Sequence, residues 1–307
     1  MNPPPDIVNL ADGIIPLIDR PIETVLVTND DGVSSPFFKP TLEALKSCGH
    51  FKKVIFVAPA EEQSWIGTAV TRFKPVYAEP ISLDGADGFV VSGTPSDCVY
   101  LGLNNLFPQP PDLVVSGINL GTNTGRAFTA SSGTISAAAA SFFGGCRSVA
   151  VSAKVPPIVF EEWGRHDLKC LNQYLSTWNS VALAAVRLII KLIEIKIWNY
   201  SDVPALDLPW HVSPQTCIRV TTPAPTYYGQ IFDSVGPGRY LHRFKGLQIG
   251  DPLGRPVRSA ANSHFSDIEV INQEEIAINP LSFGFFGSPH LGSPGEILSS
   301  LRTLLGQ

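Results

Sequence analysis

The sequence predicts an α/β protein built on a doubly wound, mostly parallel sheet, Rossmann-like in its core, with a strand-rich C-terminal extension. Three observations support this fold class. Short apolar segments rich in Val and Ile alternate with helical segments through the first half of the chain, which is the pattern of strands covered by helices on both faces. Each apolar segment ends in a polar loop. After about residue 204 the alternation gives way to segments typical of strands.

The expected elements of the first half follow in a regular order. Strands open the segments 23–32, 52–64, 87–107, 111–125 and 147–153. We expect one helix over 36–49, where Gly49 marks its end, and another over the small residues of 132–145. A further helix follows the Gly-Thr-Pro turn of the third strand, with Ser96 or Asp97 as its cap.

The less regular parts of the chain lie at its ends and in its second half. The stretch 180–198 is strongly apolar, but charged residues such as Arg187 and Lys191 interrupt it, so it predicts a largely buried helix rather than a membrane span. The preceding segment, 154–180, is expected to be variable surface. The expected organisation is an irregular arm over 1–21, one domain over 22–287 with its core at 22–200 and its extension at about 204–281, and a tail over 288–307.

Composition narrows the class of protein. Hydrophobic residues make up 44% of the 307 residues and charged residues 16%, with a formal net charge of -5. The negative charge argues against nonspecific binding to a nucleic acid polymer or an anionic membrane. Five scattered cysteines form no zinc motif, and the N-terminus lacks the basic start and apolar core of a secretory signal. We therefore expect a soluble, cytoplasmic protein with reduced thiols.

Asp30 and Asp31 stand at the end of the first strand, in the sequence Asn29-Asp-Asp-Gly32. Two adjacent carboxylates at a buried strand end repel each other unless a cation or hydrogen-bond donors compensate. Their oxygens suit a hard divalent cation. The simpler alternative is that Asp31 and Gly32 only form a turn that ends the strand.

A further strand-end motif and a helix start add polar groups. Asn119 directly follows a buried strand, and Asn123 lies in the glycine-rich loop after it. Their amide oxygens are good neutral ligands for Mg²⁺, Mn²⁺ or Ca²⁺, although Asn also favours turns for its own sake. Ser131 to Thr134 open a helix, where free amides and the helix dipole attract phosphate. An ordinary Ser N-cap explains the same residues.

Other catalytic signatures are missing from the sequence. It holds no nucleophile elbow, no Walker phosphate loop and no dinucleotide-binding glycine fingerprint. The six histidines are scattered, and none lies in a predicted strand-end loop. A histidine-based triad or zinc site is therefore not expected.

Taken together, the motifs VLVTNDDG, VAPAEEQS, VSGTPSDCVYLGL, PDLVVSGINLGTNTG and SGTISAAA resemble, in order and spacing, the SurE family of metal-dependent nucleotidases and phosphatases. The resemblance covers roughly residues 23 to 153. A weaker similarity continues from IRVTTPAP to the strand-rich segment that ends at 281. It implies a doubly wound core with a β-hairpin extension that is often exchanged between the subunits of a dimer. It also implies hydrolysis of nucleoside 5′- and 3′-monophosphates, and in some members of short polyphosphate.

The resemblance further implies a set of site residues. One divalent cation per subunit, Mg²⁺ or Mn²⁺ with Ca²⁺ as a further possibility, would be held by Asp30, Asp31, Ser64 and Asn119. Asp30, Asp31 and Asn119 would be catalytic, with one acid either activating a water or attacking the phosphorus itself. Substrate and phosphate would be contacted by Asn29, Asn123, Ser132, Gly133 and Thr134. The expected partners are a nucleoside monophosphate and further copies of this chain, in a homodimer or homotetramer.

This sequence departs from the family pattern in two places. Trp65 follows Ser64 where the family usually has glycine, and the loop 126–131 offers Arg126 instead of acidic residues. A bulky ring could narrow the pocket or stack against a base, and Arg126 could clamp a phosphate or simply be a solvated charge. These departures motivate a second hypothesis, a catalytically impaired protein that binds nucleotide or phosphate on the same fold. A third is a purely structural α/β subunit.

Overall fold

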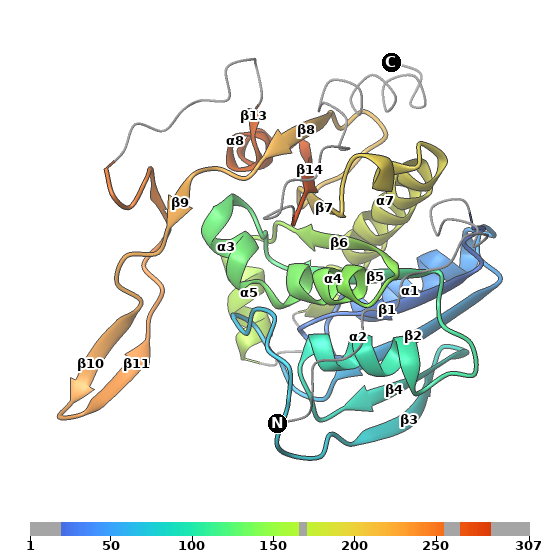
Figure 1. The fold of residues 1–307 in the computed structure, drawn as a ribbon. Coiled ribbons are helices and arrows are strands. Elements are labelled where there is room, and N and C mark those ends of the chain that lie inside the picture. Colours follow the sequence, from blue (N-terminus) through green and yellow to red (C-terminus); the bar gives the residue numbers. More distant parts are fainter. Residues whose placement is uncertain (1–19, 166–170, 255–264, 284–307) are drawn as a thin grey trace.

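The structure is a computed structural model, and it describes residues 20–165, 171–254 and 265–283. Its centre is a ten-stranded sheet with the strand order β13-β8-β14-β7-β6-β5-β1-β2-β4-β3 (Figure 1). The strands of this sheet are β1 (Thr24–Thr28), β2 (Lys53–Pro59), β3 (Ala78–Leu83), β4 (Ala86–Val91), β5 (Leu113–Leu120), β6 (Arg147–Ala153), β7 (Val203–Leu208), β8 (Ile218–Thr222), β13 (Phe265–Ser266) and β14 (Ile276–Leu281). The helices are α1 (Phe38–Ser47), α2 (Pro95–Asn104), α3 (Gly125–Ser131), α4 (Gly133–Phe143), α5 (Pro157–Gly164), α7 (Leu175–Glu194), α8 (Asp267–Asn272) and the 3₁₀ helix η2 (Ile197–Asn199).

The middle of the sheet is parallel, as predicted. Strands β4, β2, β1, β5, β6 and β7 run side by side in parallel, whereas β3 and β14 join their neighbours β4 and β7 in the antiparallel direction. The chain moves from β1 to β2 and β4 on one side, and later to β5, β6 and β7 on the other. The order therefore reverses between β1 and β5, and ligands of open α/β sheets bind at such a point, outside the carboxyl ends of the strands.

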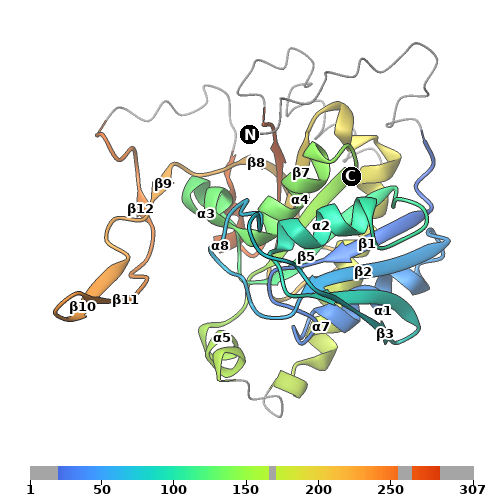
Figure 2. The same ribbon diagram turned by 60° about the horizontal axis from the view of Figure 1, so that its bottom comes forward.

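Two layers of helices cover the sheet (Figures 1 and 2). Helices α1 and α7 pack together on one face, and α2 and α4 pack together on the other. Along β1 the buried side chains alternate between the two layers: Val25 and Val27 belong to the core under α1 and α7, and Leu26 to the core under α2 and α4. This alternation explains why the strands read as continuous apolar runs.

Some predicted details differ in the structure. The cap of α2 is Thr94, not Ser96 or Asp97: its side chain accepts from the Asp97 backbone N–H, and the Asp97 carboxylate accepts from the Thr94 N–H. The segment 154–180 is not merely surface, because Val159 and Trp163 of α5 and Trp178 of α7 are buried. The long apolar helix spans Leu175–Glu194 rather than 180–198. The predicted irregular arm and the tail fall almost wholly outside the described residues.

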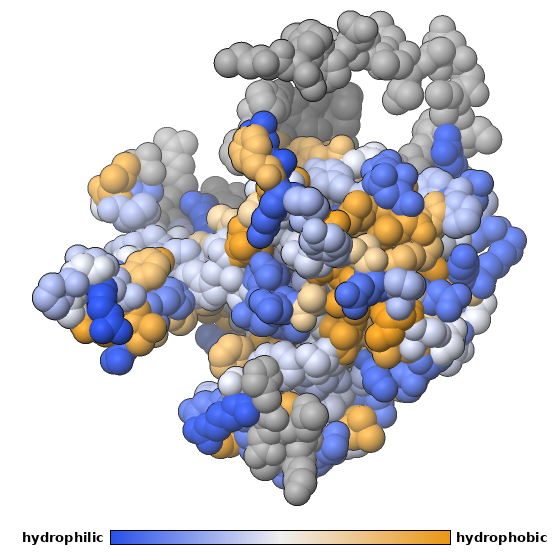
Figure 3. All heavy atoms as spheres, turned by 90° about the horizontal axis from the view of Figure 1, so that it is seen from below, coloured by the Kyte–Doolittle hydropathy of each residue, from blue (hydrophilic) through white to orange (hydrophobic). Residues whose placement is uncertain are grey.

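Helix α7 is the one helix in the described part of the chain that is long and apolar enough, by length and composition, to cross a membrane. Its apolar side is buried, with Trp178 and Leu192 in the core beside α1. Seen from below, the body carries a group of apolar residues bordered by hydrophilic ones (Figure 3), and α7 exposes Leu175 and Leu183. An amphipathic helix packed in this way is typical of the core of a soluble protein.

The strand-rich C-terminal region has two parts. Strands β7, β8, β13 and β14 complete the central sheet, whereas β9 (Thr226–Tyr227), β10 (Phe232–Gly236), β11 (Arg239–His242) and β12 (Gln248–Ile249) form two small antiparallel pairs outside it. The β10–β11 hairpin projects away from the body in both ribbon views (Figures 1 and 2).

A buried carboxylate fastens this region to the core. Asp267, at the start of α8, accepts hydrogen bonds from the backbone N–H groups of Ala224 and Gly125 at 2.9 and 2.8 Å, and from Asn279 Nδ2 at 3.0 Å. Gly125 opens α3 beside the strand ends. The same carboxylate thus holds the extension, the end of the sheet and α3 in one arrangement.

Candidate active site

The loop after β1 lies at the point where the strand order reverses. Asn29 closes this loop, because its amide donates to the Gly32 carbonyl at 2.9 Å and its Oδ1 accepts from the Gly32 N–H at 3.1 Å. Asn29 is fully buried. Its side chain therefore shapes the loop that presents Asp30 and Asp31, rather than facing solvent.

Asp30 and Asp31 are both buried and are held by hydrogen bonds from different elements. Asp30 Oδ1 accepts from Thr134 Oγ1 at 2.6 Å, and Asp31 Oδ2 accepts from the Leu120 N–H at 3.0 Å. Burial raises the pKa of Asp30 to about 6 despite the Thr134 bond. Burial, together with the charge of Asp30, raises the pKa of Asp31 well above its ordinary value. The loop thus concentrates negative charge that these hydrogen bonds do not balance.

Strand β5 brings the two asparagines to the same edge. Asn119 Nδ2 donates to the Gly121 carbonyl at 2.8 Å, which leaves its Oδ1 as the atom able to bind a further group. Asn123 makes more hydrogen bonds: its Nδ2 donates to Ser152 Oγ at 2.8 Å and its backbone N–H donates to Asp207 Oδ1 at 2.9 Å. Both residues line the same cavity.

The start of α4 meets the β1 loop directly. Ser132 is the N-cap, and its Oγ accepts from the Ile135 N–H at 3.1 Å, so the ordinary capping interpretation holds for this residue. Gly133 passes so close to Asp30 that a β-carbon on it would lie 2.7 Å from Asp30 Cβ and 2.7 Å from Asp30 Oδ2. Glycine at this position is therefore required by the close approach of α4 to the acid.

Most of the predicted residues share one cavity of about 890 Å³. Of the predicted set, Asp30, Ser64, Asn119, Asn123 and Ser132 line it, whereas Asn29, Asp31, Gly133 and Thr134 are buried and are not part of the lining. Arg126 is exposed and is not part of the lining.

Sequence reasoning did not find the other half of the cavity. Its lining includes Glu62 and Thr122 from the strand-end loops, Phe128 from α3 and Phe160 from α5. Ile231, Phe232, His242 and Phe244 come from the extension. No histidine was expected in a strand-end loop, and His242 reaches the cavity by another route, because it belongs to β11, which folding brings there from far along the chain. No local pattern marks the residues that the extension contributes.

The donors present fit a hard divalent cation. In the part of the chain that the structure describes, no Lys, Arg or His forms an ion pair with Asp30 or Asp31, and no three His, Cys, Asp or Glu side chains gather in one place. A cation at this edge would therefore draw on amide and hydroxyl oxygens as well as the two carboxylates. Such an all-oxygen set suits Mg²⁺, Mn²⁺ or Ca²⁺ and does not suit zinc.

Comparisons with known proteins all give matches to one family. The family model described as "Survival protein SurE" matches residues 25–230. A protein of Thermosynechococcus vestitus named "5'-nucleotidase SurE" is 43% identical over 277 residues, which cover 84% of this chain and 90% of that protein. The similarly named protein of Methanocella arvoryzae is 34% identical over 84% of this chain and 91% of its own length.

Other matches are shorter or structural. The "5'-nucleotidase SurE" of Methanopyrus kandleri is 42% identical over 131 residues, and this chain spans 49% of its length. The crystal structure of the SurE protein from Aquifex aeolicus superposes with a TM-score of 0.61 at 25% identity, covering 92% of this chain and 99% of that one. On the match of the family model and of relatives along most of its length, this chain belongs to the SurE family.

Proposed function

We propose that this chain hydrolyses phosphate monoesters, most readily nucleoside monophosphates, with the help of one divalent cation. The names of its relatives, "5'-nucleotidase SurE", support this reaction. Support from this chain comes from one observation: Asp30 and Asn119 line a single cavity at the point where the strand order reverses, with Asp31 held directly behind them.

In this proposal Asp30, Asp31, Ser64 and Asn119 hold the cation, Mg²⁺ or Mn²⁺. When bound, a divalent cation offsets the charge of the phosphoryl oxygens and makes a nearby water more acidic. Asp30 lines the cavity, so it is the carboxylate placed to take the proton of the attacking water or to attack in its place. The Leu120 N–H holds Asp31 in place through a hydrogen bond. Asp31 in turn orients the two carboxylates of the β1 loop.

The substrate phosphate lies at the start of α4 in this proposal. Ser132, Gly133 and Thr134 form the first turn of an eleven-residue helix, whose N-terminal amides and dipole favour an anion. Asn123 lines the cavity beside them. Asn29 contributes indirectly, through the turn that presents the two acids.

The proposal is tested by phosphate release from a panel of nucleoside 5′- and 3′-monophosphates. We expect release with Mg²⁺ or Mn²⁺, none after EDTA, and recovery when the cation is returned. Asp31→Asn keeps an oxygen for the Leu120 N–H and should fold normally, yet lose activity by at least about 100-fold. Near-wild-type, cation-dependent activity in this variant would contradict the assigned ligand set. Absence of release from every monophosphate would contradict the function.

The hypothesis of a catalytically impaired binding protein gains no support. Trp65 stands beside Ser64 in the lining without displacing Asp30 or Asn119 from it. The loop 126–131, which departs from the family pattern, forms the body of α3 and ends at Ser131 in the lining. Both departures therefore leave the polar side of the cavity complete.

We also propose that the chain works as a homodimer or homotetramer in the cytoplasm. The β10–β11 hairpin exposes Val235, Tyr240 and Leu241 to solvent, and an isolated two-stranded hairpin is marginally stable in water. A second copy of the chain would cover these side chains. The described cysteines form no disulfide, which suits a reducing compartment. Sedimentation or light scattering measures the oligomeric state.

A further inference from the structure

The cavity has two chemically different halves. One half is polar and contains the groups assigned above to the cation and the phosphate. The other half is aromatic, and its lining consists of Trp65, Phe128, Phe160, Phe232, His242 and Phe244. A phosphate monoester bound through its phosphate would direct its organic group into this second half.

Trp65 is the ring around which the aromatic half is arranged. Its centroid lies 4.7 Å from that of Tyr228, 4.8 Å from His242, 5.4 Å from Phe244 and 5.6 Å from Phe128. Trp65 and Phe128 belong to the core, and the other three rings belong to the extension. These separations are in the range at which aromatic pairs attract each other.

The backbone of Trp65 is in a conformation that tryptophan disfavours. Its φ is +63°, in the left-handed region that glycine adopts without cost and that costs other residues roughly 1 kcal/mol. A large ring is thus kept at a position where the backbone alone favours glycine. The contacts of the Trp65 ring, rather than its backbone conformation, therefore explain why tryptophan occupies this position.

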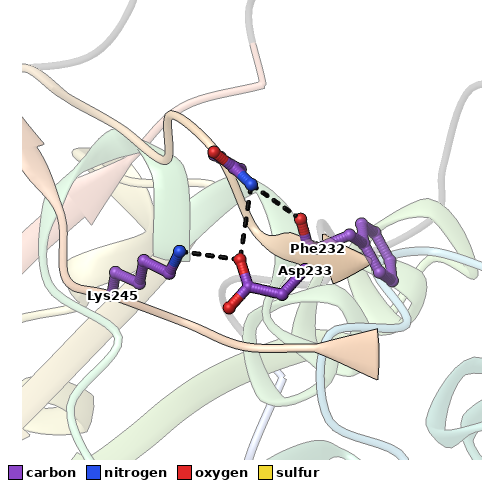
Figure 4. A network of polar contacts seen from close by, with 4 residues as sticks. Phe232, Asp233 and Lys245 are labelled. Carbon is purple, nitrogen blue, oxygen red and sulfur yellow. Dashed lines mark hydrogen bonds and ion pairs between the residues drawn. The ribbon is translucent and has the colours of Figure 1, made fainter. Parts of the chain in front are cut away.

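Polar contacts hold the extension in place near the aromatic residues that it contributes to the cavity. Lys245 Nζ lies 2.7 Å from Asp233 Oδ1 and joins the two sides of the hairpin base (Figure 4). Phe232 and Phe244, the neighbours of these two residues, line the cavity. The Tyr228 hydroxyl donates to the Ala127 carbonyl of α3 at 2.7 Å and also contacts the Ser131 hydroxyl. The aromatic half is therefore built by core and extension together, and Tyr228 joins the two.

We propose that this aromatic half is a nucleobase subsite and that Trp65 determines the preference for nucleotides over phosphate monoesters without a base. The proposal rests on the proposed function and adds a substrate-selecting residue to it. Aromatic side chains stack on any base, because every base has a π-face, and one such contact changes affinity by about fivefold to 100-fold. His242, which has ring nitrogens, adds a group able to hydrogen-bond with a base edge.

The test compares kcat/KM for AMP with kcat/KM for ribose 5-phosphate, which lacks only the base. The wild-type protein should prefer AMP by at least about fivefold. Trp65→Gly, which suits the left-handed backbone, should remove most of that preference by lowering kcat/KM for AMP while changing it little for ribose 5-phosphate. Trp65→Phe should retain part of the preference. Phe73→Ala serves as the control, because Phe73 is on the same loop but is 91% exposed and outside the lining.

Several outcomes would overturn the proposal. Equal kcat/KM for AMP and ribose 5-phosphate in the wild-type protein would do so while leaving the proposed phosphatase function intact. So would an equal loss for both substrates in Trp65→Gly, since that result indicates a structural role. If Trp65→Gly fails to fold, inhibition of the wild-type protein tests the subsite instead. Adenosine should compete with AMP and ribose should not, and equal inhibition by the two would overturn the proposal. If no phosphate is released from any substrate, the proposed function has failed, and calorimetry with AMP and ribose 5-phosphate tests the subsite separately.

Discussion

Thr134 donates its hydroxyl to Asp30 across 104 positions of sequence, with 2.6 Å between Thr134 Oγ1 and Asp30 Oδ1. The bond joins the helix that would receive the phosphate to the loop that would hold the cation. It also lowers the pKa of Asp30, in opposition to the larger effect of burial. The first turn of α4 therefore positions the acid and helps to keep it ionised.

Removing this hydroxyl should weaken cation binding. In Thr134→Val the carboxylate of Asp30 loses its donor, becomes harder to ionise and is less well oriented, so we expect affinity for Mn²⁺ to fall by about tenfold or more. Thr134→Ser keeps the hydroxyl and should bind Mn²⁺ nearly as the wild type does. Calorimetric titration with Mn²⁺ measures the affinity of each variant for the cation. Equal affinities for the Val and Ser variants would show that the bond has no such role.

A methyl group at Gly133 should displace Asp30. An added β-carbon would lie 2.7 Å from the side chain of Asp30, closer than real contacts allow, so Gly133→Ala must push the acid or the helix aside. We expect phosphatase activity to fall by about 100-fold, although alanine favours helix formation. Gly164→Ala is the matched control, because a β-carbon there meets open space. Full activity in Gly133→Ala would show that the close approach does not matter.

Asp207 should make stability depend on pH. Burial raises the pKa of Asp207 to about 7, from about 3.9 in an unfolded chain. Between these values the folded protein holds a proton that the unfolded chain has released, so the free energy of unfolding should decrease as pH rises from about 4 to 7. Above pH 7 the charged form costs on the order of 4 kcal/mol.

Asp207→Asn removes this titration while it keeps an oxygen for the Asn123 N–H. Chemical denaturation at several pH values should therefore show the variant gaining stability relative to wild type as pH rises from 4 to 7. A constant difference across this range would mean that Asp207 titrates normally in the folded protein.

Asp267 should be essential to the attachment of the extension. Asp267→Ala leaves the backbone donors of Gly125 and Ala224 and the amide of Asn279 without their acceptor, and we expect a loss of about 3 kcal/mol or more in the free energy of unfolding. Asp87→Ala, at an exposed position, should change stability by less than about 0.5 kcal/mol. Similar small effects for the two variants would indicate that the network contributes little.

The fold was largely predictable because the sequence patterns that indicate its strands and helices are local. The apolar runs and the polar residues that end them follow from burial of both faces of a parallel sheet, so Asp30 and Asn119 could be placed at one edge before the structure was known. Strand β3 was missed for the opposite reason: it is an edge strand whose side chains from Glu79 to Ser82 are exposed, and it carries no apolar pattern. Thr94 was missed as a cap because three polar residues in that turn suit the role.

The site was predictable only on its polar side. Asp30, Ser64, Asn119 and Ser132 line one cavity; the first three lie in recognisable strand-end motifs, and Ser132 lies in a recognisable helix start. Phe232, His242 and Phe244 reach the same cavity through the fold of the extension, which short-range pattern does not encode. The contact of Leu120 with Asp31 was also hidden, since it is made by a backbone N–H.

In the proposed function the β1 loop and the end of β5 hold one cation between them. A crystal of the protein soaked in Mn²⁺, with anomalous scattering recorded, shows directly whether a cation binds there. We expect one peak per subunit at about 2 Å from oxygens of Asp30, Asp31 and Asn119, and none in crystals of Asp31→Asn grown in the same way. A Mn²⁺-soaked crystal of the wild-type protein without density between these side chains would show that they do not form a cation site.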